Sequence, residues 1–201
     1  MKAYNFAMAF VTAAAIFTGA ALNASTTIAS CLGTVDDDYD YYFGQSFTVS
    51  GSYYLNSISI YKNEVTLADG TGSTLYLFAS AYSGTPGGLS SSSYVATGSW
   101  DSVSDSWVFS GSYTLTEGTT YYFYSDTSFN AGVFYTDVYA SGMIYYCGSG
   151  DSFGYSGDND LCFSVTGTAV PEPATCTGLI GLIALGAAGG RKLFVKRKSC
   201  N

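Results

Sequence analysis

Carboxylates are the side chains best suited to chemistry in this 201-residue chain, because the sequence contains no histidine. Histidine is the commonest general base and transition-metal ligand, so Ser–His and Cys–His nucleophile pairs and most zinc sites are excluded. Glycoside hydrolysis needs two opposed carboxylates, one with a raised pKa. Most aspartates occupy polar, turn-like positions, and the glutamates are only Glu64, Glu117 and Glu172. We therefore expect a protein that is not an enzyme, with a glycoside hydrolase as the least favoured alternative.

Two groups of aspartates offer hard oxygen ligands. One lies in the stretch 36–40, and the other consists of Asp151, Asp158 and Asp160. Ca²⁺ takes six to eight oxygen ligands, but neither stretch follows the EF-hand loop, which ends in glutamate. Solvated acidic loops are the preferred interpretation. A structural calcium ion held by Asp151, Asp158 and Asp160 is the alternative, and no other cofactor is expected.

Five cysteines form a second set of reactive side chains. Cys147 and Cys162 enclose fourteen residues, and in an exported protein we expect them to form a disulfide. Closing a loop of that size stabilises a fold by about 3 kcal/mol. Two independent thiols are the alternative. Cys31 is left unpaired, and Cys176 and Cys200 belong to the tail. The local alternation of apolar and polar residues predicts that Cys162 faces away from the core.

Aromatic residues are abundant, with 19 tyrosines, 13 phenylalanines and two tryptophans. Exposed rings aligned on a sheet stack against sugars, and Trp100 and Tyr76 are the candidates for that role. The preferred interpretation is a β-sheet core, because aromatic residues are common in half-buried strands.

The charges are strongly segregated along the chain. Between Ser25 and Val170 there is one basic residue against fourteen acidic ones, a net charge of −13, while five of the seven basic residues lie among the last eleven. An acidic surface of this kind repels phosphates, so we expect no nucleic-acid partner.

The body of the chain is typical of an all-β domain. Apolar residues alternate with polar ones, as in Leu161, Phe163 and Val165, and Gly, Ser, Asn and Asp separate these runs. The segments 107–109 and 113–115 flank Ser110–Ser112, a predicted hairpin turn. About eight to ten such strands indicate an antiparallel two-sheet sandwich, with a jelly roll as the expected topology.

The N-terminus has the pattern of a secretory signal peptide. Met1-Lys2 precedes the apolar run Phe6–Leu22, which predicts a signal helix cleaved after Ala24. The alternatives are a retained transmembrane helix and a lipoprotein signal that ends at Cys31.

A shorter apolar run closes the chain. Thr177–Gly190 has fourteen residues, and adding 174–176 brings it to the lower limit for spanning a bilayer. We expect a hydrophobic helix at 174–190 and a basic tail at 191–198, which should stay cytoplasmic while the body lies outside the inner membrane.

The order of these tail elements resembles a PEP-CTERM sorting signal. Pro171, Glu172 and Pro173 match its motif, and Arg191 and Lys192 match its basic end, although the chain continues past them to Asn201. The resemblance implies export through the Sec machinery, an inner-membrane-tethered precursor and cleavage by an exosortase. It further implies that the protein reaches the outer surface or extracellular matrix of a Gram-negative bacterium. An ordinary C-terminal membrane anchor is the alternative.

The body resembles the choice-of-anchor domains of surface proteins. The similarity lies in short strings, such as those at 45–49, 55–60, 84–87, 113–122 and 160–167. That family has no established catalytic residues to carry over.

Four parts are therefore predicted: a signal peptide (1–24), an acidic segment (25–43), a β-sandwich domain (44–168) and a sorting signal (169–201). The expected function is that of a non-catalytic cell-surface or matrix protein, and the alternative is a carbohydrate-binding module that recognises exopolysaccharide.

Overall fold

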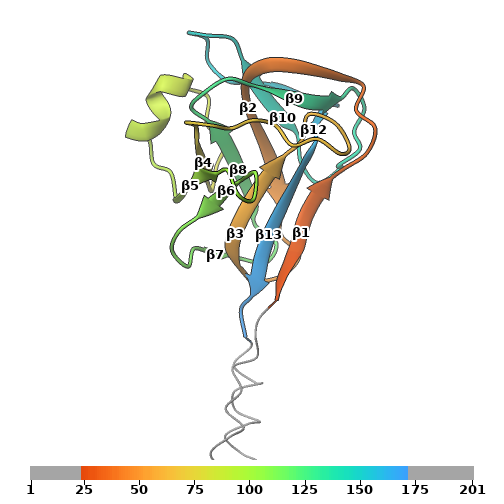
Figure 1. Cartoon of the computed structure of the whole chain (residues 1–201). Helices are drawn as coiled ribbons and strands as arrows, with labels where there is room; N and C mark the ends of the chain where they lie inside the picture. Colours follow the sequence, from red (N-terminus) through yellow and green to blue (C-terminus); the bar gives the residue numbers. More distant parts are fainter. Residues whose placement is uncertain (1–23, 172–201) are drawn as a thin grey trace, which may run out of the picture.

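A computed structural model describes residues 24–171 of the chain (Figure 1). The predicted signal helix and the predicted hydrophobic helix at 174–190 lie outside these residues. In the range 24–171, no helix has the length and apolar character needed to cross a membrane.

The described segment is all-β, as predicted. Its strands are β1 (Ser25–Cys31), β2 (Asp37–Thr48), β3 (Tyr53–Ile60), β4 (Thr74–Phe78), β5 (Ala96–Asp101), β6 (Ser106–Phe109), β7 (Thr114–Leu115), β8 (Thr120–Ser125), β9 (Phe129–Phe134), β10 (Ile144–Cys147), β11 (Gly154–Ser156), β12 (Asp160–Leu161) and β13 (Phe163–Ala169). A short 3-10 helix, η1 (Pro86–Ser91), precedes β5.

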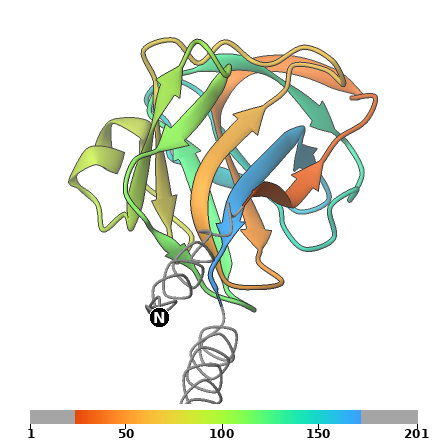
Figure 2. The same ribbon diagram turned by 60° about the horizontal axis from the view of Figure 1, so that its bottom comes forward.

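The strands form one connected antiparallel network that curls into a nearly closed barrel (Figure 2). Its main path runs β1-β13-β3-β6-β5-β4-β8-β2-β10-β11. The long strand β2 connects two ladders, because its first half pairs with β9 and its second half pairs with β8 and β10. The two layers expected of a sandwich are therefore continuous through β2.

Two details differ from the sequence-based prediction. The acidic segment 25–43, predicted to precede the domain, forms β1 and the first half of β2, so the β-domain begins at Ser25. The prediction of a hairpin around Ser110–Ser112 is wrong, because β6 and β7 both pair with β3 and not with each other. The hairpin partner of β6 is β5.

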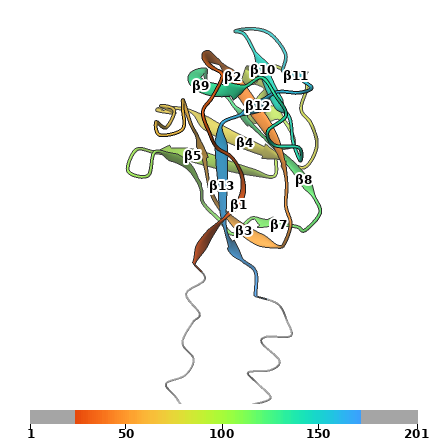
Figure 3. The ribbon, with the colours of Figure 1, turned by 90° about the vertical axis from the view of Figure 1, so that its right-hand side faces the viewer.

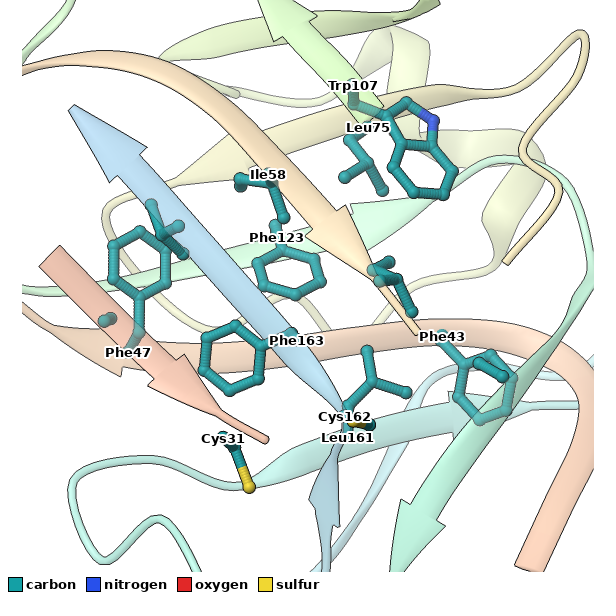
Figure 4. Close-up of a cluster of buried hydrophobic side chains, with 14 of the residues drawn as sticks. Cys31, Phe43, Phe47, Ile58, Leu75, Trp107, Phe123, Leu161, Cys162 and Phe163 are labelled. Atoms are coloured by element: carbon teal, nitrogen blue, oxygen red, sulfur yellow. The ribbon is translucent and has the colours of Figure 1, made fainter. Parts of the chain in front are cut away.

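Alternation along the strands divides the buried side chains between two clusters. Leu75 and Leu77 of β4 face the main core, which is built around Trp107, Phe123 and Phe163 (Figure 4). On the opposite face of β4, Tyr76 and Phe78 belong to a second cluster. Its other members are Leu89 of η1, Tyr124, Tyr145, Cys147 and Phe153. Both faces of β4 are consequently buried.

The two ends of the domain lie side by side. Ser25 at the start of β1 pairs with Thr168 near the end of β13. Figures 1 and 3 place these ends at one pole of the barrel, and place β9, β10 and the first half of β2 at the other.

Candidate functional site

One face of β2 runs from the core to the molecular surface. Tyr39, Tyr41 and Phe43 occupy alternate positions of this strand and therefore share a face. Phe43 is buried in the main core, Tyr39 is half-buried and Tyr41 is exposed. The strand thus presents two tyrosine rings directly beside the hydrophobic interior.

Neighbouring strands add two further rings. Tyr146 of β10 pairs with Phe43 across the ladder, and Tyr135 directly follows β9. The ring centroids are 6.4 Å apart for Tyr135 and Tyr39, 6.0 Å for Tyr39 and Tyr41, and 5.6 Å for Tyr41 and Tyr146. We call this row of four rings the tyrosine cleft. Its rings are inclined to one another by 47–54°, so the row twists as the strands do.

The tyrosine cleft encloses a pocket of about 250 Å³. Phe43, Val133 and Ile144 line it with apolar surface, and Asn159 contributes an amide. Concave sites lined mainly by aromatic and apolar side chains, with a few polar groups, are typical of small-ligand binding.

A carboxylate lies at one end of the row. Asp37 Oδ2 accepts hydrogen bonds from the hydroxyls of Tyr39 (2.9 Å) and Tyr135 (3.3 Å), which also contact each other. The backbone N–H of Asp38 and then the Tyr39 hydroxyl lower the pKa of Asp37. The pKa of Tyr39 is raised, first by its hydrogen bond to Tyr135 and then by Asp37. At neutral pH this end therefore carries an ionised acceptor and protonated phenols.

The cleft offers two kinds of surface for binding a ligand. Its rings offer flat apolar faces, while Asp37 and Asn159 offer hydrogen-bonding groups at the edges. This combination suits a ligand with apolar C–H faces and a rim of hydroxyl groups, because both kinds of surface are then matched.

The two rings predicted to stack on sugars lie elsewhere. Tyr76 is only 8% exposed and packs edge-on against Tyr94, which contradicts its predicted role as an exposed platform. Trp100 is half-buried against Trp107, with centroids 4.7 Å apart, and borders a shallow depression beside Asp69 and Asp105. The structure therefore does not bring Tyr76 and Trp100 together.

The predicted disulfide is also contradicted. Cys147 and Cys162 are free, and they belong to different clusters. Cys147 of β10 belongs to the second cluster, with Tyr124 and Phe153, whereas Cys162 is fully buried in the main core. The prediction that Cys162 faces away from the core is wrong, because the chain does not alternate regularly between β12 and β13.

The three aspartates proposed for calcium do not form a ligand set. Asp151 and Asp158 are exposed, while Asp160 is buried. The Asp160 carboxylate accepts hydrogen bonds from Gln45 Nε2 (3.0 Å) and from the backbone N–H of Tyr139 (2.7 Å). In the part of the chain that the structure describes, no three acidic, cysteine or histidine side chains gather as a metal site.

The tyrosine cleft was missed because its central strand was placed outside the domain. The usable signal is the alternation Tyr39, Tyr41, Phe43, which predicts one aromatic strand face. Nothing local connects that face with Tyr135 or Tyr146, since strand pairing brings them together.

The end of the described segment leads into the predicted sorting signal. The backbone N–H of Val170 still donates to Ser52 O, and Pro171 is the last described residue. Glu172, Pro173, Arg191 and Lys192 lie outside the described residues.

Comparison with known proteins identifies this segment. Residues 169–198 match the PEP-CTERM protein-sorting motif. A search among curated proteins gave no match to the chain. The resemblance of residues 44–168 to choice-of-anchor domains stays a prediction, as do the signal peptide and the membrane helix. The predicted sorting signal is confirmed, and the chain is accordingly an exported protein that is sorted by exosortase to the cell surface.

Proposed function

We propose that the β-domain is a non-catalytic module that binds a neutral polysaccharide of the cell surface or extracellular matrix. The observation that carries this proposal is the row of four tyrosines in one pocket. Tyr41, Tyr135 and Tyr146 are 36%, 46% and 40% exposed. Large aromatic surface left open to water in a concave site is typical of ligand recognition.

The charge of the domain favours a neutral ligand. Its net charge of −13 and the position of Asp37 beside the cleft oppose the approach of uronic acids or phosphates. A neutral sugar is not repelled by these charges, and its hydroxyls can donate hydrogen bonds to the Asp37 carboxylate.

The carboxylates of the domain support a binding role over hydrolysis. Between residues 24 and 171, Asp160 is the buried carboxylate, and both of its oxygens are engaged by Gln45 and Tyr139. Asp37 is exposed and its pKa is lowered, which is opposite to what a general acid requires.

Replacing Tyr41 and Tyr146 tests the proposal. We expect Tyr41→Ala and Tyr146→Ala each to weaken binding about tenfold or more, because each removes one stacking face. Retention of the protein in native gels that contain neutral or uronic-acid-rich polysaccharides measures the effect. Neutral glycans should retard the wild type, and acidic ones should not.

Tyr155→Ala is the matched control for these variants. Tyr155 lies on β11, outside the cleft, where it is 71% exposed and pairs with Tyr145 of β10. An equal loss of retention in this control would contradict a role for the tyrosine cleft. If no neutral glycan retards the folded wild type, the domain has a purely structural role in the matrix.

A further inference from the structure

The tyrosine cleft has an apolar floor beneath its aromatic rim. Phe43, Val133 and Ile144 line the pocket, belong to the main core and are at most 4% exposed. Three of the four tyrosine rings are 36–46% exposed and therefore form the rim. A ligand that carries only hydroxyl groups cannot cover such a floor without losing hydrogen bonds to water. The floor instead fits an apolar substituent that reaches below a sugar ring stacked on the rim.

A side-chain amide lies beside this floor. Asn159 lines the same pocket and is half-buried. Its carbonyl oxygen accepts a hydrogen bond from the backbone N–H of Ile144 (3.2 Å), and its backbone N–H donates to Ser156 O (3.4 Å). Within residues 24–171 these bonds involve the Asn159 backbone, which leaves the side-chain amide, with its N–H donors and carbonyl acceptor, open to a ligand.

An acetamido group matches both the floor and the amide. It joins a methyl group, which is apolar, to an N–H donor and a carbonyl acceptor. The methyl group can cover the floor while the N–H and carbonyl pair with Asn159. A 6-deoxy or O-methyl sugar also supplies a methyl group, but it covers the half-buried Asn159 amide without offering the same hydrogen bonds, which costs free energy.

The charge of the domain agrees with an acetylated sugar. A uronic acid is anionic and is repelled by the net charge of −13, whereas an N-acetylated amino sugar is neutral. Its ring hydroxyls can still donate to the Asp37 carboxylate at the end of the row, where the hydroxyls of Tyr39 and Tyr135 already converge.

We infer that the tyrosine cleft recognises N-acetylated amino sugars within a neutral polysaccharide. The sugar ring stacks on the tyrosines, the methyl group of the acetamido substituent contacts the floor of Phe43, Val133 and Ile144, and its amide pairs with Asn159. This inference rests on the proposed function and names the substrate class of the same site.

Two series of oligosaccharides with the same linkage test the role of the acetamido group. Fully N-acetylated chito-oligosaccharides and cello-oligosaccharides of equal length differ at one carbon of each sugar, which carries an acetamido group in the first and a hydroxyl in the second. Isothermal titration calorimetry of the exported protein should give an affinity at least about tenfold higher for the chito-oligosaccharides. Equal affinities, or tighter binding of the cello-oligosaccharides, would overturn the inference.

A third ligand distinguishes the source of the sugar. Uncross-linked peptidoglycan strands also carry acetamido groups, but every second sugar bears a lactyl carboxylate. We expect these strands to bind more weakly than the chito-oligosaccharides, because their carboxylates meet the acidic domain. Binding of equal or greater strength would support recognition of the acetamido group and place the ligand in the cell wall.

Asn159→Ala tests the contact with the amide. The substitution keeps both backbone hydrogen bonds of Asn159, so the midpoint of thermal unfolding should stay close to that of the wild type. The ratio of chito- to cello-oligosaccharide affinity should fall about fivefold or more. Asp158→Ala is the matched control, because Asp158 is exposed and does not line the pocket. An unchanged ratio in Asn159→Ala, or an equal fall in Asp158→Ala, would contradict the assignment of Asn159.

The failure of this inference differs from the failure of the proposed function. If neutral glycans retard the wild type in native gels but chito-oligosaccharides are not preferred, only the substrate class is wrong. If no neutral glycan binds in either assay, the sugar-binding role and the substrate class are both wrong.

Discussion

Trp107→Ala is expected to lower the free energy of unfolding by about 3–5 kcal/mol, because it removes the largest side chain of the core. The Trp107 indole is fully buried, with ring centroids 4.7 Å from Trp100 and 5.2 Å from Phe129. A Cβ on Gly70 would lie 2.2 Å from its ring, so the surroundings are shaped to the indole. Denaturant unfolding followed by circular dichroism measures the loss. It is a large share of the total free energy of unfolding of a domain, which is roughly 5–15 kcal/mol.

Ser73→Ala separates packing from hydrogen bonding at this tryptophan. Trp107 Nε1 donates to Ser73 Oγ over 2.8 Å, and the variant leaves that N–H unpaired at a cost of about 1–3 kcal/mol. If Trp107→Ala and Ser73→Ala lower the free energy of unfolding equally, the packing of the indole contributes little to stability.

Asp160→Ala is expected to lower the free energy of unfolding by about 2–5 kcal/mol. The substitution removes the acceptor of the partly buried backbone N–H of Tyr139 and one of the two acceptors of the buried Gln45 Nε2, which keeps only Ser46 O. Gln45 cannot compensate by turning its amide, because its Oε1 accepts the backbone N–H of Leu161 at 2.9 Å. Chemical unfolding at pH 7 measures the change. An unchanged free energy of unfolding would contradict this prediction and would mean that water takes the place of the carboxylate.

Asp160→Asn removes the titratable group but also replaces one acceptor oxygen with a donor, so the pH dependence of its stability, and not the absolute value, reports the Asp160 charge. Burial raises the pKa of Asp160, opposed in part by the hydrogen bonds from Tyr139 and Gln45. A raised folded-state pKa favours folding most below the unfolded-state pKa of about 3.9, and this contribution is lost as pH rises through the folded-state pKa. The stability of the wild type relative to Asp160→Asn should therefore fall with rising pH across that window. A relative stability that grows with pH would show that the charged form is the favoured one.

Local features of this chain were predictable from sequence. The alternation of Leu75, Tyr76, Leu77 and Phe78 predicts a strand because side-chain direction depends on the backbone alone. The sorting motif was equally accessible, since its residues are contiguous and match residues 169–198.

Features that depend on strand pairing were not predictable. Cys147 and Cys162 are close in sequence, yet β10 and the β12–β13 segment place them in separate clusters. Cys31 is far away in sequence, but the β1–β13 register brings it opposite Phe163. Tyr39 and Tyr146 meet in one cleft for the same reason. Register between distant strands is fixed by burial of the whole core, which no short window contains.

The placement of the two chain ends gives the domain an orientation. β1 begins and β13 ends at one pole of the barrel, while β9, β10 and the first half of β2 lie at the other, where the four tyrosines gather (Figures 1 and 3). A molecule held at its β13 end therefore turns its aromatic face away from its support. The barrel then acts as a spacer between that support and the tyrosines.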